Sequence, residues 1–193
     1  TDIALLDRDE SILAFNERVL DWAKRPEVPL LERLRYLCIV SSNLDEFFEV
    51  RADLHMSAFR NQDTKGNYNT STFEKVYETA RSLVTEQYKL YNDVLLPSLE
   101  KEKIQLLSHA QRNTAQKKWV QEYFRREVKP LLVPVGLDPA HPFPQVANKS
   151  LNFIVQLSGK DAFGRSNDIA IVKVPRVLPR VIPLPAKVAG GDK

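Results

Sequence analysis

The fold is decided by residues 29–54, which read PLLERLRYLCIVSSNLDEFFEVRADL. The apolar positions of this stretch recur every three or four residues, the period of an amphipathic helix. They include Leu30, Leu31, Leu34, Leu37, Cys38, Leu44, Phe47, Phe48 and Leu54. Pro29 stands at the first turn, a position that proline favours. The pattern predicts either one long helix or two helices that join near Ser41, Ser42 and Asn43.

Two further amphipathic segments flank this stretch. The first should begin at a cap supplied by Asp9 or Ser11 and end near Arg25, because Pro26 disfavours helical geometry in the residue before it. Its apolar positions are Ile12, Leu13, Phe15, Val19, Leu20 and Trp22. The other follows a polar loop at residues 61–69, is capped within residues 70–72 and runs to about Pro97. Three such segments with short connections predict an antiparallel helical bundle over residues 1–103.

Residues 104–193 differ in character, since they hold 9 of the 12 prolines. A helix is expected from Asn113 or Thr114 to about Val128. Two strands, 151–157 and 169–174, should form a hairpin. Weaker β-prone runs occupy 104–107, 131–133 and 181–184, while 138–144 should be irregular and 186–193 frayed. The chain is therefore expected to be α+β: a helical bundle followed by a partial α/β domain with a small, mainly antiparallel sheet.

Composition excludes several classes of protein. The chain has 193 residues, of which 43% are hydrophobic and 27% charged, as in ordinary globular domains. Cys38 is the single cysteine, so neither a disulfide framework nor a thiolate zinc cluster can form within the chain. No apolar run reaches the roughly 18 to 20 residues of a membrane span, and the start does not read as a signal peptide. We therefore expect a cytoplasmic protein with no transmembrane segment.

Charge is unevenly distributed along the sequence. Residues 1–103 carry a net charge of −5 and residues 104–193 carry +8. The basic part includes Lys117, Lys118, Arg125, Arg126 and Lys129, all within one predicted helix. These side chains could simply form a solvated face, or they could guide a polyphosphate or an acidic neighbour.

The residues contain no complete catalytic set. His55, His109 and His141 are scattered, and each is better explained as a solvated or structural side chain than as a catalytic one. Phosphate-binding loops of the G-x-x-x-x-G-K-[ST] and G-x-G-x-x-G types do not occur in the sequence.

A polar interruption at residues 41–48, SSNLDEFF, lies within the central helical stretch. If the helix continues, Asp45 shares a face with apolar residues and needs a partner, so a buried ion pair with Arg18, Arg33 or Arg51 is expected. Asn43 points elsewhere. Its carboxamide both donates and accepts hydrogen bonds, so it could read the edge of a nucleobase.

Together these segments resemble the N-terminal part of polyphosphate kinase, the histidine-dependent family. The matching blocks are residues 11–20 (SILAFNERVL), 29–34 (PLLERL), 41–47 (SSNLDEF), 50–51 (VR), 138–144 (DPAHPFP), 148–152 (NKSLN), 172–175 (VKVP) and 178–180 (LPR). They occur in the family's order over about residues 9–185. One departure is Ile12, where the family usually has Trp, and we expect it to alter helix packing only.

The resemblance implies a piece of a longer enzyme that moves the terminal phosphate of ATP onto inorganic polyphosphate. The family enzyme looks like four domains, of which this chain matches the helical first domain (1–103) and part of the head domain (104–193). Asn43 corresponds to an asparagine that contacts ATP. The phosphorylated histidine and the Mg²⁺ ligands would lie outside this chain, so no catalytic residue is expected here. The head domain implies a homo-oligomer in the full enzyme, and no nucleic-acid partner is expected.

Two other functions remain open from the residues. One is a non-enzymatic module that binds an anionic polymer or an acidic partner through the basic second half. The other is a structural piece that only supports dimerisation.

Overall fold

The computed structural model describes residues 7–137, 142–160 and 168–190, and it divides into two compact units, 1–106 and 107–193. The expected irregular segment 138–144 and the hairpin loop therefore lie partly outside the described residues. Each unit is considered separately below. No helix among the described residues is both long enough and apolar enough to cross a membrane.

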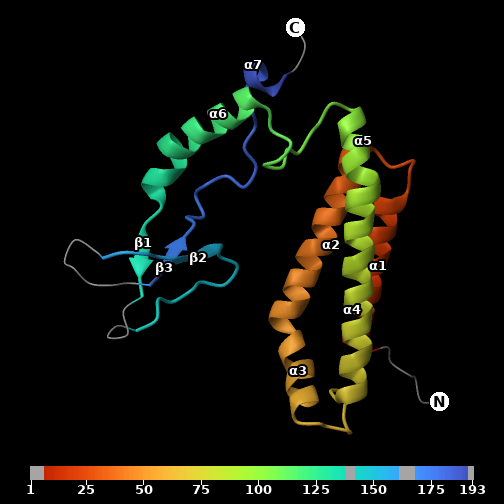
Figure 1. Ribbon diagram of the computed structural model, residues 1–193. Coiled ribbons are helices and arrows are strands. Elements are labelled where there is room, and N and C mark those ends of the chain that lie inside the picture. The colour runs from red at the N-terminus through yellow and green to blue at the C-terminus, as the bar shows by residue number, and fades with distance from the viewer. Residues whose placement is uncertain (1–6, 138–141, 161–167, 191–193) are drawn as a thin grey trace. The chain divides into compact units, whose positions relative to one another are not determined.

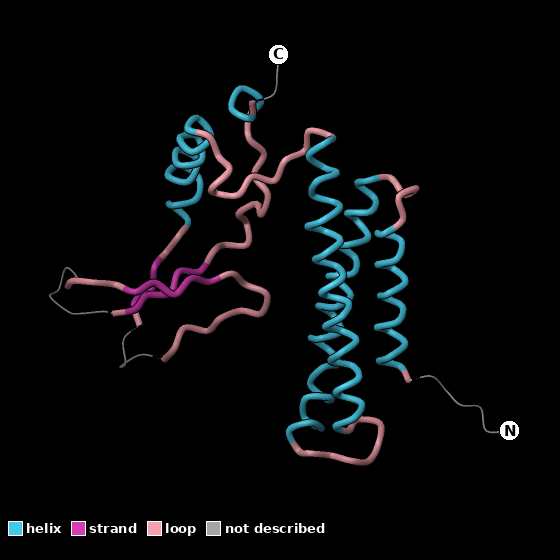
Figure 2. Tube along the Cα trace, turned by 45° about the vertical axis from the view of Figure 1, so that its right-hand side comes forward, coloured by secondary structure: helices cyan, strands magenta, loops and turns pink. Residues whose placement is uncertain are grey.

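The first unit is built of helices that run side by side (Figures 1 and 2). They are α1 (Arg8–Lys24), α2 (Leu30–Val50), α3 (Ala52–Arg60), α4 (Thr70–Leu90), the π-helical segment η1 (Tyr91–Leu95) and α5 (Leu96–Lys101). The helical bundle expected from the apolar period is confirmed, and so is the end of the first helix just before Arg25.

The caps of α1 and α4 differ from the expected ones. Asp7 caps α1, because its side chain accepts hydrogen bonds from the backbone N–H groups of Asp9 and Glu10. Asp9 is thus inside the helix and free to turn toward the core. Asn69 caps α4 and forms a reciprocal capping box with Thr72. In both cases the polar residue one or two positions earlier takes the cap.

The central stretch forms one helix through Ser41, Ser42 and Asn43 rather than two that join there. The interruption comes later, at Arg51, whose φ of −114° separates α2 from α3. The alternative of a joint at the polar residues is therefore wrong. Ser41 and Asn43 are tolerated inside α2 because their side chains bond to neighbouring helices, as described below.

The helix that begins at Thr70 does not stop at Pro97. The π-helical segment η1 directly precedes α5, and Pro97 falls within the first two positions of α5. A proline lacks the backbone N–H and so interrupts the hydrogen-bond ladder of a helix. Here that interruption falls where the π-helical η1 gives way to α5. The helical path therefore continues to Lys101.

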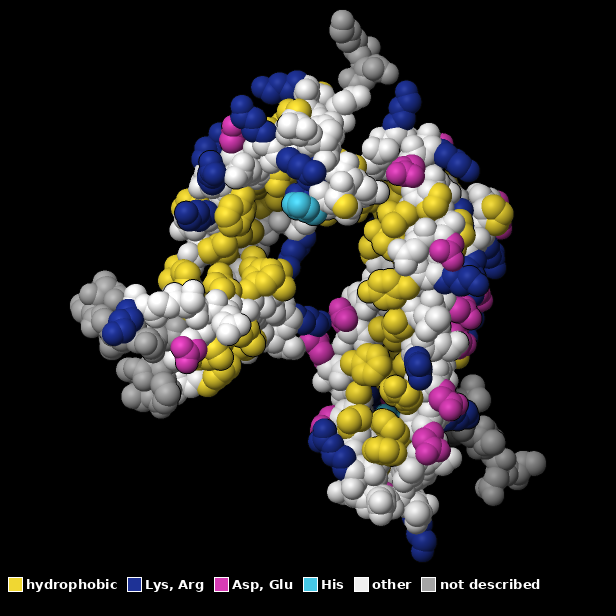
Figure 3. Space-filling model, viewed as in Figure 1, with side chains coloured by type: hydrophobic (Ala, Val, Ile, Leu, Met, Phe, Trp, Pro, Cys, Tyr) yellow, Lys and Arg dark blue, Asp and Glu magenta, His cyan; other side chains and the backbone are white. Residues whose placement is uncertain are grey.

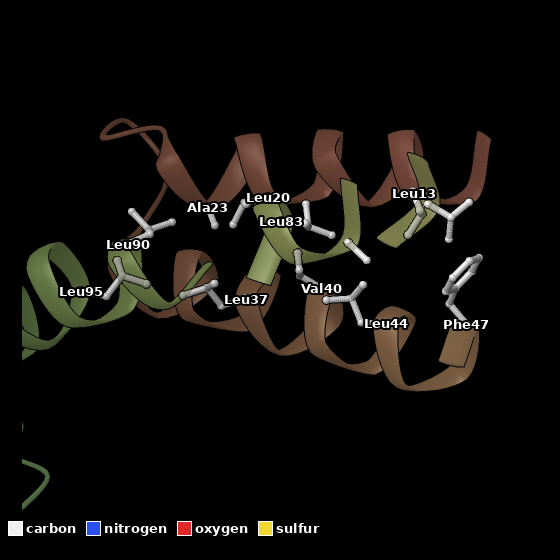
Figure 4. Close-up of a cluster of buried hydrophobic side chains, with 12 residues drawn as sticks. Leu13, Leu20, Ala23, Leu37, Val40, Leu44, Phe47, Leu83, Leu90 and Leu95 are labelled. Atoms are coloured by element: carbon white, nitrogen blue, oxygen red, sulfur yellow. The ribbon is translucent and has the colours of Figure 1, made fainter. Parts of the chain in front are cut away.

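A continuous apolar core joins α1, α2 and α4 (Figure 4). Its buried members are Leu13, Leu20, Ala23, Leu37, Val40, Leu44, Phe47, Val76, Ala80, Leu83, Leu90 and Leu95. Leu13 faces Phe47 at one end of this cluster, and Leu90 and Leu95 lie at the other (Figure 4). Phe15 and Trp22, expected on the buried stripe of α1, are exposed instead.

The second unit begins with a helix that Asn113 caps. It comprises α6 (Thr114–Tyr123), the π-helical η2 (Phe124–Val128) and the 3₁₀ turn η3 (Lys129–Leu131). Asn113 and Gln116 form a reciprocal capping box. The expected helix to about Val128 is confirmed, with Pro130 in the closing turn.

Three antiparallel strands follow: β1 (Pro134–Gly136), β2 (Asn152–Gln156) and β3 (Ile169–Lys173), in the order β1-β3-β2. Ile171 of the central strand pairs with both Val135 and Ile154. The α+β class and the antiparallel sheet are confirmed. The runs 104–107, 131–133 and 181–184 are not strands, because each meets no strand partner in the described part of the chain. Residues 186–189, expected to fray, form the short helix α7 (Ala186–Ala189).

Candidate functional site

A hollow of about 250 Å³ lies between α1 and α2. We call it the α1–α2 pocket. Its lining comes from one face of each helix and from the residue where α2 ends: Arg8, Ile12, Phe15, Asn43, Glu46, Phe47, Val50 and Arg51. On α1, the lining residues Arg8, Ile12 and Phe15 follow one another at spacings of four and three residues, so they share one face of that helix. On α2, Asn43, Glu46, Phe47 and Val50 likewise lie within one face.

The pocket combines apolar walls with a few polar groups. Phe47 closes it toward the core, while Phe15 and Val50 are exposed at its rim. The guanidinium of Arg18 lies 5.7 Å from the centre of the Phe15 ring. An exposed aromatic ring beside amide and guanidinium groups is an arrangement that suits a flat, partly polar ligand such as a nucleobase.

Asn43 is half-buried in this pocket and is held by a chain of hydrogen bonds. Its Nδ2 donates to Oδ1 of Asn16 on α1 over 3.0 Å. Asn16, which is only 1% exposed, in turn donates from Nδ2 to the backbone carbonyl of Val40 over 3.0 Å. No described residue donates to Oδ1 of Asn43. That oxygen and one Nδ2 hydrogen are therefore left for a ligand.

Arg51 is fixed at the other end of the pocket by a buried carboxylate. Its Nε lies 2.9 Å from Oδ1 of Asp9, as an ion pair without the alignment of a hydrogen bond. Oδ2 of Asp9 lies 3.0 Å from Nε2 of His55. The ring of His55 packs edge-on against Tyr68, with centroids 4.9 Å apart. Asp9 thus connects the first turn of α1 to the break between α2 and α3.

This network corrects the expectation for Asp45, which is exposed rather than buried in an ion pair. The buried carboxylate is Asp9, because Asp7 takes the cap and turns Asp9 inward. Of the three arginines proposed as partners, only Arg51 pairs with a buried acid. Arg33 instead donates to the backbone carbonyls of Ala23 and Lys24, over 2.8 and 3.4 Å, at the end of α1.

The remaining histidines and basic residues lie outside the pocket. His55 is buried as a structural partner of Asp9, His109 is exposed, and His141 falls outside the described residues. The basic side chains predicted on one helix are all exposed: Lys117, Lys118, Arg125, Arg126 and Lys129. Figure 3 shows Lys and Arg side chains gathered around α6. Within the described ranges, no three His, Cys, Asp or Glu side chains come close enough to hold a metal ion.

A second hollow, of about 210 Å³, lies between α1 and α4 and includes Lys24. Nζ of Lys24 lies 2.7 Å from Glu86 and 3.0 Å from Asp21. The hydrogen bond to Glu86 raises the pKa of Lys24, and burial opposes this only partly. The charge of Lys24 is thus paired with two carboxylates, and we interpret this hollow as a structural ion-pair site.

Several lining residues were not predicted from the sequence. Arg8 lies outside the blocks that match the family. Phe15, Glu46 and Val50 lie within those blocks but were given no binding role, and Phe15 looked like a core residue. Ile12, expected to affect only packing, lines the pocket. A further signal was the helical spacing of Arg8, Ile12 and Phe15, which places them on one face of α1.

A helical unit with a pocket that contains Asn43 is followed by a small antiparallel sheet, so the chain is an α+β protein. The family described as polyphosphate kinase N-terminal domain matches residues 5–107, and that described as polyphosphate kinase middle domain matches residues 115–193. The chain therefore belongs to the polyphosphate kinase family.

Individual relatives agree with this assignment. The chain is 53% identical to a polyphosphate kinase of Neisseria meningitidis serogroup A over 97% of its own length, and 49% identical to one of Burkholderia vietnamiensis over 96%. Each match covers 28% of the relative. The crystal structure of polyphosphate kinase from Porphyromonas gingivalis superposes with a TM-score of 0.75 at 30% identity, over 96% of this chain and 27% of that one. The chain thus spans little more than a quarter of these proteins.

Proposed function

We propose that this chain is the nucleotide-covering and head region of a polyphosphate kinase. The full enzyme would transfer the γ-phosphate of ATP to inorganic polyphosphate through a phosphohistidine outside this chain. Residues 1–103 would form the helical domain and residues 104–193 would belong to the head domain. The single observation that carries the proposal is the place of Asn43, half-buried in a pocket with apolar walls and two arginines.

The size of the pocket supports a limited role in binding. Complete ligand pockets commonly measure roughly 300–1,000 Å³. A hollow of about 250 Å³ is smaller, which suits one end of a nucleotide rather than all of it. We assign it to the base, with Asn43 at the base edge and Phe15 against its face. The phosphates would extend toward parts of the enzyme beyond this chain.

The chemistry proposed for the full enzyme has two balanced steps. A histidine nitrogen forms a bond to the γ-phosphorus while the bond to the bridging oxygen breaks and ADP leaves. A terminal oxygen of the polymer then takes the phosphoryl group and the histidine is restored. Positioning and charge neutralisation supply most of the acceleration in such transfers. This chain would contribute positioning of the base, so alone it should be inactive.

Cofactor, assembly and location follow as parts of the same proposal. Mg²⁺ would accompany the ATP phosphates, and its ligands would lie outside this chain, as the family resemblance implies. The full enzyme would form a homo-oligomer through the head domain and work in the cytoplasm. ATP and inorganic polyphosphate would be its partners.

The first test is the substitution Asn43→Ala in the full-length enzyme. We expect the KM for ATP to rise about tenfold with little change in kcat, because one or two hydrogen bonds to the base are lost. Adding the missing C-terminal domains to this chain should also restore ATP-dependent polymer synthesis.

Asp45→Ala is the matched control, since Asp45 lies two residues away on α2 but is exposed outside the pocket. It should leave the KM unchanged. An unchanged KM for Asn43→Ala would remove Asn43 from the nucleotide site.

The alternative function is a module that binds an anionic polymer without catalysis. It is favoured by the five exposed basic side chains Lys117, Lys118, Arg125, Arg126 and Lys129. Of these, Arg126 pairs with the adjacent Glu127 over 2.7 Å, a contact that leaves most of the positive charge available.

A further inference from the structure

Asn16 lies behind the α1–α2 pocket and does not line it. Its side chain is almost completely buried between α1 and α2, and both ends of its amide are used. One end bonds to a backbone carbonyl and the other to Asn43. A buried amide could serve merely to hold the two helices together, as Gln87 does between α4 and α2.

The order of these bonds fixes which way each amide faces. The carbonyl oxygen of Val40 can only accept, so Nδ2 of Asn16 must face it. Oδ1 of Asn16 then faces Asn43, and because that oxygen also only accepts, Nδ2 of Asn43 must face Asn16. A main-chain atom of α2 thereby determines the orientation of the Asn43 amide.

The edge of Asn43 left for a ligand is consequently one acceptor, Oδ1, beside one donor, the second Nδ2 hydrogen. This edge complements adenine, which offers an exocyclic amino donor next to a ring nitrogen acceptor. A 6-oxo purine places an acceptor where the amino group would be, opposite Oδ1. If the Asn43 amide were reversed alone, its Oδ1 would face Oδ1 of Asn16, and two acceptors would repel each other. If both amides were reversed, Oδ1 of Asn16 would face the carbonyl oxygen of Val40, which is again a contact between two acceptors.

We propose that Asn16 is a positioning residue that fixes the polarity of the Asn43 amide and so makes the pocket select 6-amino over 6-oxo purines. This inference rests on the proposed function, because it requires the pocket to hold the base. It assigns a role to a residue that does not touch the ligand.

The test compares ATP with ITP, which carries oxygen in place of the 6-amino group, in the full-length enzyme. The unmodified enzyme should prefer ATP by about tenfold or more in kcat/KM, since a site built to hydrogen-bond an amino group rejects an analogue without it. Asn16→Leu, of similar size and without polar atoms, frees the Asn43 amide to turn. We expect its KM for ATP to rise, its ATP preference to fall toward one, and its kcat with ATP to stay within about twofold.

Gln87→Leu is the matched control. Gln87 is another buried amide that bonds to α2, through the carbonyl of Leu37 and the hydroxyl of Ser41, yet it lies outside the α1–α2 pocket. It should lose stability as Asn16→Leu does but keep the preference for ATP. Equal loss of preference in both variants would reduce Asn16 to a packing role and overturn the inference.

The outcomes separate the two claims. If Asn43→Ala raises the KM for ATP while Asn16→Leu keeps the original ATP preference, this inference fails and the proposed function stands. If Asn43→Ala changes neither quantity, the nucleotide pocket itself fails. Should Asn16→Leu not fold, neutron diffraction from the unmodified enzyme decides. Deuterons on the Asn43 nitrogen facing Asn16 support the inference, and the reverse orientation overturns it.

Discussion

Asp9 is the one buried carboxylate among the described residues, and its burial is made possible by two partners. Arg51 neutralises one oxygen and His55 faces the other. An ionised carboxylate is expensive to bury without such partners. The arrangement is also favoured by the position of Asp9 in the first turn of α1, where negative charge interacts well with the helix dipole.

Asp9→Asn should destabilise the helical unit by about 3 kcal/mol, because Arg51 and His55 lose the charge that they face. Chemical denaturation followed by circular dichroism measures this. Asp21→Asn, an exposed carboxylate on the same helix, should change the free energy of unfolding by less than about 0.5 kcal/mol. A loss of similar size for both variants would contradict the role given to the buried pair.

Within the helical unit, α2 is anchored to α1 at both ends by arginine side chains. Near the start of α2, Arg33 donates to the carbonyls of Ala23 and Lys24 that close α1. These carbonyls are among the last of the helix and have no partner within it. At the end of α2, Arg51 reaches Asp9 in the first turn of α1.

Arg33→Met should therefore lower the free energy of unfolding by about 2 kcal/mol, because it keeps the apolar stem but leaves the carbonyls of α1 unsatisfied. Urea denaturation of the two proteins gives the difference. Arg35→Met is the companion variant, since Arg35 is exposed and its ion pair among the described residues is with the likewise exposed Glu32, at 3.7 Å. A stability for Arg33→Met equal to that of Arg35→Met would show that the carbonyls are satisfied by solvent instead.

The helices and strands were predictable from the sequence where they depend on the local pattern of apolar residues. The apolar spacing after Leu30 and the β-prone runs around Ile154 and Ile171 depend on neighbouring residues, and both elements were predicted correctly. The α1–α2 pocket depends on which face of one helix meets which face of another. Phe15 therefore looked like a core residue, and Asp9 like a cap, because each belongs to a pattern that several contexts share. The chemistry of Asn43 indicated that it could read a base edge, and the family resemblance then assigned it to ATP.

At the scale of the whole chain, the distribution of charge distinguishes the proposed kinase region from the alternative, a non-enzymatic module that binds an anionic polymer. The net charge is −5 over residues 1–103 and +8 over residues 104–193. If the basic part binds an anionic polymer by itself, the isolated chain should bind polyphosphate at low salt. Affinity should then fall steeply as salt rises, since exposed charges are screened.

Fluorescence anisotropy with labelled polyphosphate measures this binding over a series of salt concentrations. The proposed kinase fragment should bind no more tightly than non-specific contacts do, with dissociation constants of about 1–100 µM or weaker at physiological salt. Tight binding that is abolished by neutralising Lys117, Lys118, Arg125, Arg126 and Lys129 to Gln would favour the non-enzymatic module.

The contacts of Arg33 and Arg51 between α1 and α2 have a mechanical consequence for the α1–α2 pocket. Because α1 and α2 are pinned to each other at opposite extremities, neither can slip lengthwise against its neighbour. The α1–α2 pocket is thus preorganised, and a ligand would bind without a large entropic cost for ordering the residues that line it.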